Sequence, residues 1–217
     1  DPYASLASNI PSNSCSTGYW WAPDRRNDPP LPSSNRRSAT LDDDVWDSCG
    51  DAELFGPLLI TQPNTLIIVR GGSLFLDNHT IETLPGASVT IIFTGPHFSG
   101  REHIPQGTGG FDIQAPTSGP WSGIAMYQNP SLTSGVDIEE AGNSPTWDIT
   151  GVVYLPKAYV EFSGAVNKSS HGHSCFVLVM DHLRINGTGS ILAHDECQAA
   201  GVTMPYSPTP SRGQLVS

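Results

Sequence analysis

Short apolar segments recur along most of this chain, and each one stops at Gly, Pro or a polar corner. Five of them can be laid under one another, at residues 66–69, 89–93, 123–128, 151–156 and 175–180. They are rich in β-branched and aromatic residues, which is typical of strands, and they lack the spacing of an amphipathic helix. The sequence therefore predicts an all-β chain.

A second short strand is expected after each of the first ones. These second strands fall at residues 73–77, 111–116, 136–142, 159–164 and 183–189. Repeated strand pairs at uneven spacing are typical of a solenoid, in which each coil completes the core of its neighbour. We predict a parallel β-solenoid (β-helix) of about five irregular coils, with an antiparallel sandwich as the alternative. The expected core positions are Ile68, Ile91, Ala125, Val153 and Val177.

Composition supports one structural domain with many tight corners. The chain has 217 residues, of which 22 are Gly and 19 are Pro, and only 14% are charged. We expect an irregular N-terminal cap at 1–57, which contains Trp20, Trp21 and Trp46, and a solenoid body at 58–217. The net charge of −11 repels phosphate backbones and anionic lipid, which argues against nucleic acid as a partner.

The four cysteines are spaced like disulfide partners. None of them forms a CxxC pair, which argues against a zinc ribbon or a thioredoxin-like site. Three connectivities are possible, and the pairing of sequence neighbours, Cys15 with Cys49 and Cys175 with Cys197, closes two separate loops. Two disulfides indicate an oxidising compartment.

Two long gaps between strands predict loops that stand out from the body, at residues 95–110 and 129–143. Glycines that follow second strands, at 142, 164, 187 and 189, are expected to turn the corners with positive φ. On or beside the loops lie side chains suited to contact with a partner. They are His97, Arg101, His103, Trp121, Tyr127, Asn129 and Trp147. For the aromatic side chains Trp121, Tyr127 and Trp147, packing in the core is the favoured alternative.

Signals of catalysis and of metal binding are weak. No nucleophile elbow, zinc-protease helix, phosphate loop or dinucleotide fingerprint is present. Acids that share a strand (Asp137, Glu139, Glu140) are the carboxylates to consider for a glycosidase, although a solvated strand looks the same. A metal site could be built from His171, His173, His194 and Asp195, but solvated loops have the same composition. We expect neither a catalytic centre nor a cofactor.

Three blocks carry a resemblance to a known family. They are APTSGPWSGIAMYQ (115–128), GVVYLPKAYVEFSG (151–164) and the Cys-bounded final unit at 175–197. Together with the closing GQLVS, they resemble the C-terminal region of TadG-like proteins of the Flp (tight adherence) pilus-assembly system. The likeness covers 58–217, and residues 1–57 match only through the DPYASL start. It implies an extracytoplasmic bacterial protein, in the periplasm or at the cell surface, with an N-terminal anchor outside this sequence.

The function expected from these observations is that of a non-enzymatic component of pilus assembly or adhesion, acting as a rigid scaffold. Its partners would be other pilus-assembly or envelope proteins, and surface glycans are a further class. Deletion of residues 130–142 is expected to abolish attachment and leave the fold intact. The alternatives are a β-helix polysaccharide lyase or hydrolase and a glycan-binding surface module. The first would need paired carboxylates in a groove, and the second exposed aromatic side chains.

Overall fold

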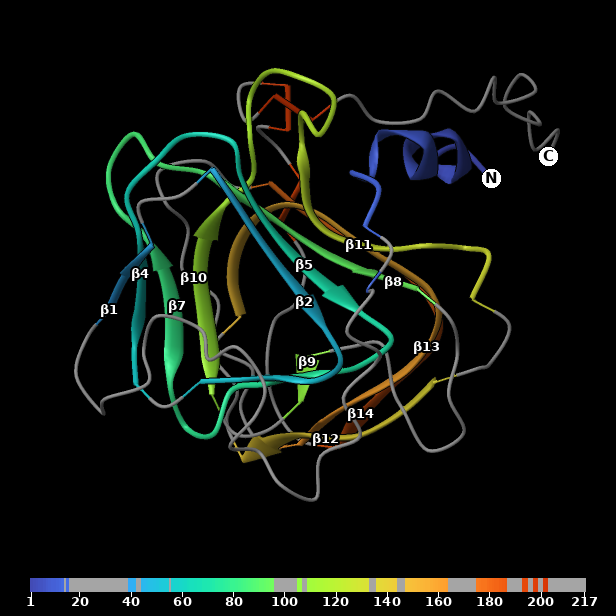
Figure 1. Cartoon of the computed structure of the whole chain (residues 1–217). Helices are drawn as coiled ribbons and strands as arrows, with labels where there is room; N and C mark the ends of the chain where they lie inside the picture. The colour runs from blue at the N-terminus through green and yellow to red at the C-terminus, as the bar shows by residue number, and fades with distance from the viewer. Residues whose placement is uncertain are drawn as a thin grey trace, which may run out of the picture.

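The computed structural model describes thirteen stretches of the chain. They are residues 1–13, 15, 39–41, 44–54, 56–95, 105–106, 109–132, 136–143, 147–163, 175–186, 193–194, 197–198 and 201–202. Strands dominate these stretches, and one short 3₁₀ helix, η1 (Ala4–Asn9), precedes them (Figure 1).

The strands stack on three sides of a coil that the chain winds repeatedly. The first side holds β1 (Ala39–Leu41), β4 (Leu58–Ile60), β7 (Thr80–Thr83), β10 (Gly110–Gln114) and the start of β13 (Trp147–Ser163). The second holds β2 (Val45–Cys49), β5 (Thr65–Arg70), β8 (Val89–Thr94), β11 (Ile124–Gln128), the middle of β13 and the first half of β14 (Cys175–Asn186).

The third side begins with β3 (Ala52–Glu53), β6 (Leu74–Phe75) and β9 (Pro105–Gln106). It continues with β12 (Val136–Asn143), the end of β13 and the second half of β14. All of these pairings are parallel, and the antiparallel pair in the described residues joins β14 to β15 (Ala193–His194). The predicted parallel β-solenoid is confirmed, with about four turns.

The boundaries of the coils differ from the prediction in two places. Strands β1 to β3 lie within residues 1–57, yet they pair with β4, β5 and β6 and so belong to the first coil. Residues 111–116, expected as a second strand, contain β10, which opens the next coil on the first side. The strands of the first side were not predicted as a separate set, because they are short and carry polar residues at alternate positions.

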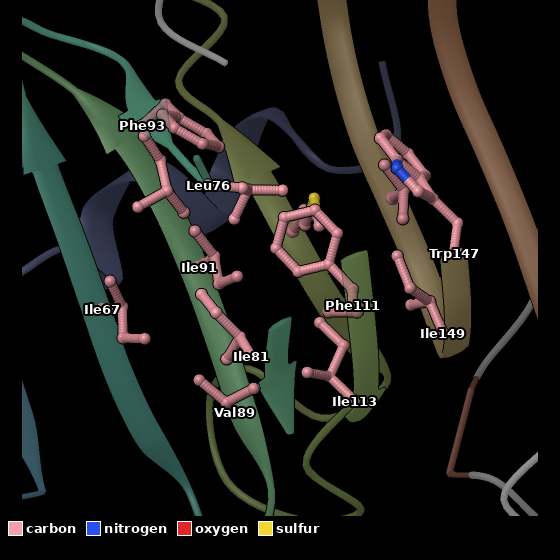
Figure 2. Close-up of a cluster of buried hydrophobic side chains, with 14 of the residues drawn as sticks. Ile67, Leu76, Ile81, Val89, Ile91, Phe93, Phe111, Ile113, Trp147 and Ile149 are labelled. Carbon is pink, nitrogen blue, oxygen red and sulfur yellow. The ribbon is translucent and has the colours of Figure 1, made fainter. Parts of the chain in front are cut away.

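The interior consists of apolar columns that run from coil to coil. On the second side, Ile67, Ile91, Met126 and Val153 stand in register and are fully buried. A matching column on the first side consists of Leu58, Ile81, Phe111 and Trp147. Figure 2 shows side chains from both columns meeting inside the coil. Burial of each one contributes about 1.5–3 kcal/mol, which makes these columns the main source of stability.

A second apolar cluster lies outside the coil, on the outer surface of the second side. Its column consists of Ile68, Ile92, Tyr127 and Tyr154, in register on four neighbouring strands. Of the five expected core residues, Ile91, Ala125 and Val153 lie in the interior. Ile68 and Val177 belong to this outer cluster, and Val177 is only partly buried.

An N-terminal segment covers this outer cluster; we call residues 1–13 and Cys15 the strap. The Tyr127 hydroxyl donates to the carbonyl of Tyr3 over 3.1 Å, and the Tyr154 hydroxyl donates to the carboxylate of Asp1. In Figure 1 the blue segment runs past β11 and β8. The strap therefore lies across the coils, perpendicular to the direction in which they wind.

Both predicted disulfides are present. Cys15 of the strap is bonded to Cys49 at the end of β2, and Cys175 at the start of β14 is bonded to Cys197. The first disulfide therefore fixes the strap to the first coil. The second fixes Cys197 to β14 in the last described coil.

The corner glycines lie elsewhere than expected. Gly142 is part of β12, and residues 164, 187 and 189 lie outside the described stretches. Positive φ occurs instead at Gly50, Gly71 and Gly95, each directly after a strand of the second side. The three stack because the amide of Gly50 donates to the carbonyl of Arg70 and that of Gly71 to the carbonyl of Thr94. Glycine is needed here because other residues rarely adopt this backbone conformation.

Candidate functional site

The two predicted loops, 95–110 and 129–143, are shorter than expected, because residues 105–106 form β9 and residues 136–143 form β12. The remaining links, residues 95–104 and 129–135, both connect the second side to the third, and we call them the insertions. After β8 the described chain ends at Gly95 and returns at β9, and after β11 it passes Asn129 before β12 begins. In the preceding coil, only residues 71–73 separate β5 from β6. Two neighbouring coils thus carry their extra chain at one place.

The corner at which the preceding strands end has a stacked polar surface. Arg70 is in register with Thr94, and Asn129 follows the residue that pairs with Phe93. The amide nitrogen of Asn129 donates to the Thr94 hydroxyl over 3.1 Å. The Arg70 guanidinium donates to both carboxylate oxygens of Asp47, over 2.7 and 2.9 Å. The positive charge of Arg70 at the corner is therefore neutralised by Asp47.

A hollow of about 670 Å³ lies between this corner and the strap. Its lining combines an apolar wall, made by Ala7, Ile10 and Pro11, with hydroxyl, amide and guanidinium groups. The polar members are Ser12, Asn13, Arg70, Thr94 and Asn129. Such a lining suits hydrogen bonding to neutral polar groups, such as peptide amides or sugar hydroxyls, better than binding of a strongly charged ligand.

The predicted contact residues differ in their exposure. Asn129 lines the hollow, whereas Trp121, Tyr127 and Trp147 are buried. Trp121 packs edge-on against Tyr127, and Trp147 packs edge-on against Phe111 inside the coil. These three aromatic side chains therefore pack in the body, as their alternative role required, and they are not exposed contact residues. His97, Arg101 and His103 lie outside the described residues.

Three carboxylates stand in register on the first side; Glu82 and Asp112 are partly exposed, and Asp148 is buried. Glu82 of β7, Asp112 of β10 and Asp148 of β13 occupy equivalent positions on neighbouring strands, which are about 4.8 Å apart. Glu82 and Asp112 border a hollow of about 440 Å³. Sequence reasoning missed this column, although TIET, GFDIQ and WDIT carry an acid at the same place.

The side chains of the other predicted acids and metal ligands lie outside the part of the chain that the structure describes. Asp137, Glu139 and Glu140 lie on β12, and their side chains are not described. His171, His173 and Asp195 lie outside the described stretches, as does the side chain of His194. Within those stretches, no three His, Cys, Asp or Glu residues are grouped to hold a metal ion. Nor is any helix there long and apolar enough to cross a membrane.

No family model, curated protein or solved structure matches this chain.

Proposed function

We propose that this protein is a non-enzymatic extracytoplasmic scaffold that binds other envelope proteins through the corner carrying its two insertions. The observation behind this proposal is that the strands before both insertions end at one corner of neighbouring coils, and that Thr94 and Asn129 at this corner line a polar hollow. A solenoid with disulfides at its first and last coils is a stiff support for such a surface, and disulfides are typical of oxidising compartments. The resemblance to TadG-like proteins makes pilus assembly or adhesion in a bacterial envelope the proposed setting.

The fold changes how this proposal is tested. Deletion of residues 130–142 would remove most of β12, which pairs with β13, so such a variant would lose a strand of the stack. Substitutions within the insertion are the sharper test. In the triple variant His97→Ala, Arg101→Ala, His103→Ala, we expect loss of pilus-dependent attachment with an unchanged melting temperature.

A matched control uses the same residue types at a different place. His182 and Arg184 are exposed on β14, and their double substitution by Ala should leave attachment intact. Full attachment by the triple variant would contradict the assignment of binding to this corner. Pull-down of a single envelope protein by the wild type, lost in the triple variant, would identify the partner.

A carbohydrate-active enzyme is the second candidate, and the column of Glu82, Asp112 and Asp148 is the observation that favours it. Carboxyl groups about 5–9 Å apart are the spacing that glycosidases use, and one or two strand steps place acids in this range. The test is a screen of polysaccharides with the purified protein. Turnover that is lost in Asp112→Asn would replace the scaffold proposal with this one.

A further inference from the structure

The strap makes a series of contacts that crosses the second side from the last coils to the first. Asp1 accepts from Tyr154 on β13, and the carbonyl of Tyr3 accepts from Tyr127 on β11. Further along, the carbonyl of Pro11 accepts from Arg70 on β5, and Cys15 is bonded to Cys49 on β2. From β13 to β2 is four strand steps, or about 19 Å.

The surface beneath the strap is an apolar cluster that contains several aromatic rings. Tyr127 stacks on Tyr154 with 5.3 Å between ring centroids, and Trp121 packs edge-on against Tyr127 at 5.1 Å. The ring of Tyr3 enters this group and lies 5.3 Å from that of Tyr154. Ile68 and Ile92 continue the cluster toward the first coil.

Recognition of the strap uses two kinds of contact. Tyr127 and Arg70 donate to main-chain carbonyls, which any peptide carries. Side-chain selection takes place at one end, where the carboxylate of Asp1 meets Tyr154 and the Tyr3 ring packs on the aromatic group. Leu6 adds a partly buried aliphatic contact to the same cluster. The surface thus combines hydrogen bonds to the strap backbone with contacts to particular side chains, as peptide-binding surfaces do.

The strap itself contributes little to its own attachment. Of residues 1–13, only Tyr3 is buried, and η1 contains no buried residue. A single stretch of 3₁₀ helix has poor hydrogen-bond geometry and adds little stability alone. A short and mostly exposed segment therefore covers an extensive apolar surface, and the disulfide at Cys15 holds its far end in place.

We infer that the second side of the solenoid is a peptide-binding surface that the chain's own strap covers. Its ligand is a segment of another polypeptide that carries a carboxylate, a tyrosine two residues later and an aliphatic residue three positions after the tyrosine. The strap blocks this ligand because its attachment to the same chain gives it a high effective concentration. This inference concerns a different surface from the corner of the proposed function and does not depend on it.

The experiment uses the full chain and a synthetic peptide with the sequence of residues 1–13, labelled at its C-terminal end. Fluorescence anisotropy measures binding to the wild type and to Tyr3→Ala, in which the strap has lost its one buried side chain. We expect the variant to bind the peptide at least about tenfold more tightly than the wild type does. A peptide carrying Tyr3→Ala should bind neither chain.

Three further variants separate binding at this surface from general loosening of the fold. Ser8→Ala alters an exposed strap residue and should behave as the wild type. Adding Tyr127→Phe to the Tyr3→Ala chain removes the donor to the peptide carbonyl and should weaken binding again. If circular dichroism shows that Tyr3→Ala does not fold, Leu6→Ala takes its place, with the same expected gain.

Two outcomes would overturn the inference. One is equal binding of the peptide by the wild type and by the loosened chain, and the other is equal binding of the two peptides. Dimers of the wild type that form through exchanged straps, detected by light scattering and abolished by Tyr3→Ala, would replace the foreign ligand with a second copy.

Discussion

At the scale of single residues, the two stacked tyrosines under the strap, Tyr127 and Tyr154, have raised pKa values. Burial is the largest cause, and it raises the pKa of both Tyr127 and Tyr154 to about 12 from the ordinary value of 10.0. A backbone hydrogen bond from Ala7 partly opposes the effect at Tyr127, and the neighbouring Tyr127 adds to it at Tyr154. Both phenols therefore keep the proton with which they bind the strap well into the alkaline range.

These raised pKa values predict that the folded protein loses stability at alkaline pH. Because the folded pKa lies above the unfolded one, the stabilisation is complete below the unfolded pKa of 10.0 and is lost as the pH rises toward about 12. The melting temperature should therefore fall over this interval, and tyrosinate absorbance should rise together with unfolding. Tyr127→Phe, which cannot ionise, should show a shallower fall. An equal slope in both proteins would contradict this origin.

The ion pair between Arg70 and Asp47 gives a second prediction. The Arg70 side chain is only 7% exposed, so Asp47→Asn would leave a buried guanidinium without its counter-charge. We expect a loss of about 3 kcal/mol in the free energy of unfolding, measured in urea. Asp181→Asn is the control, because the contact of Asp181 with His182 is exposed and should be worth less than about 1 kcal/mol. Equal effects would show that burial does not matter here.

At the scale of the strands and corners, successive coils pack tightly against each other at Gly72. A Cβ there would lie 2.3 Å from the carbonyl carbon of Gly50 and 2.4 Å from the amide nitrogen of Asp51. Backbone cannot move aside as a flexible side chain would, so Gly72→Ala should cost about 3 kcal/mol in thermal or urea unfolding.

The control for Gly72 is a glycine with free space around it. Gly119 has a φ of +79° and no atom within 4 Å of the added Cβ. Gly119→Ala should therefore cost only the conformational strain, about 1–2 kcal/mol. A loss at Gly72 no larger than this would show that the coils can separate at the corner.

The second side could be predicted from sequence because its strands are apolar toward both the interior and the outer cluster. All residues of β8 and β11 are buried, which produces the continuous apolar runs seen in the sequence. On the first side, inward apolar residues alternate with outward Glu82, Asp112 and Asp148 in strands of only a few residues. That signal is too short to separate from a loop, so the acidic column could not be found.

The strap could not be predicted for a different reason. Its residues are small or polar apart from Tyr3, Leu6 and Ile10, so nothing local distinguishes it from a solvated segment. The partners that order it lie far along the chain, and the pair of Asp1 and Tyr154 is separated by 153 positions. The disulfides could be predicted, because among the three possible connectivities the pairing of sequence neighbours requires no contact between distant parts of the chain.

At the scale of the whole molecule, the disulfides secure the two ends of the stack. The first closes a loop with a sequence separation of 34 and the second one of 22. Chain-entropy arguments give about 3–4 kcal/mol for each loop. Replacement of either pair by Ala should lower the stability in urea by this amount. The double variant Cys15→Ala, Cys49→Ala should in addition release the strap to proteases, whereas the Cys175, Cys197 pair should not. Equal cleavage of the strap in both variants would contradict this role.

The direction of the strap also affects the order in which the molecule is made. Because synthesis runs from the N-terminus to the C-terminus, residues 1–13 are made before the strands that they cover, and Tyr154 is made only after the strands of four coils. Asp1 therefore has no partner for its hydrogen bond until Tyr154 has been made, whereas Cys15 and Cys49 can form their disulfide earlier. Only a chain that has completed its fifth first-side strand and the β13 segment beyond it offers the tyrosine that Asp1 binds. Closure of the strap thus reports that nearly the whole solenoid has been assembled, and a truncated chain would leave its aromatic surface open to quality-control proteases.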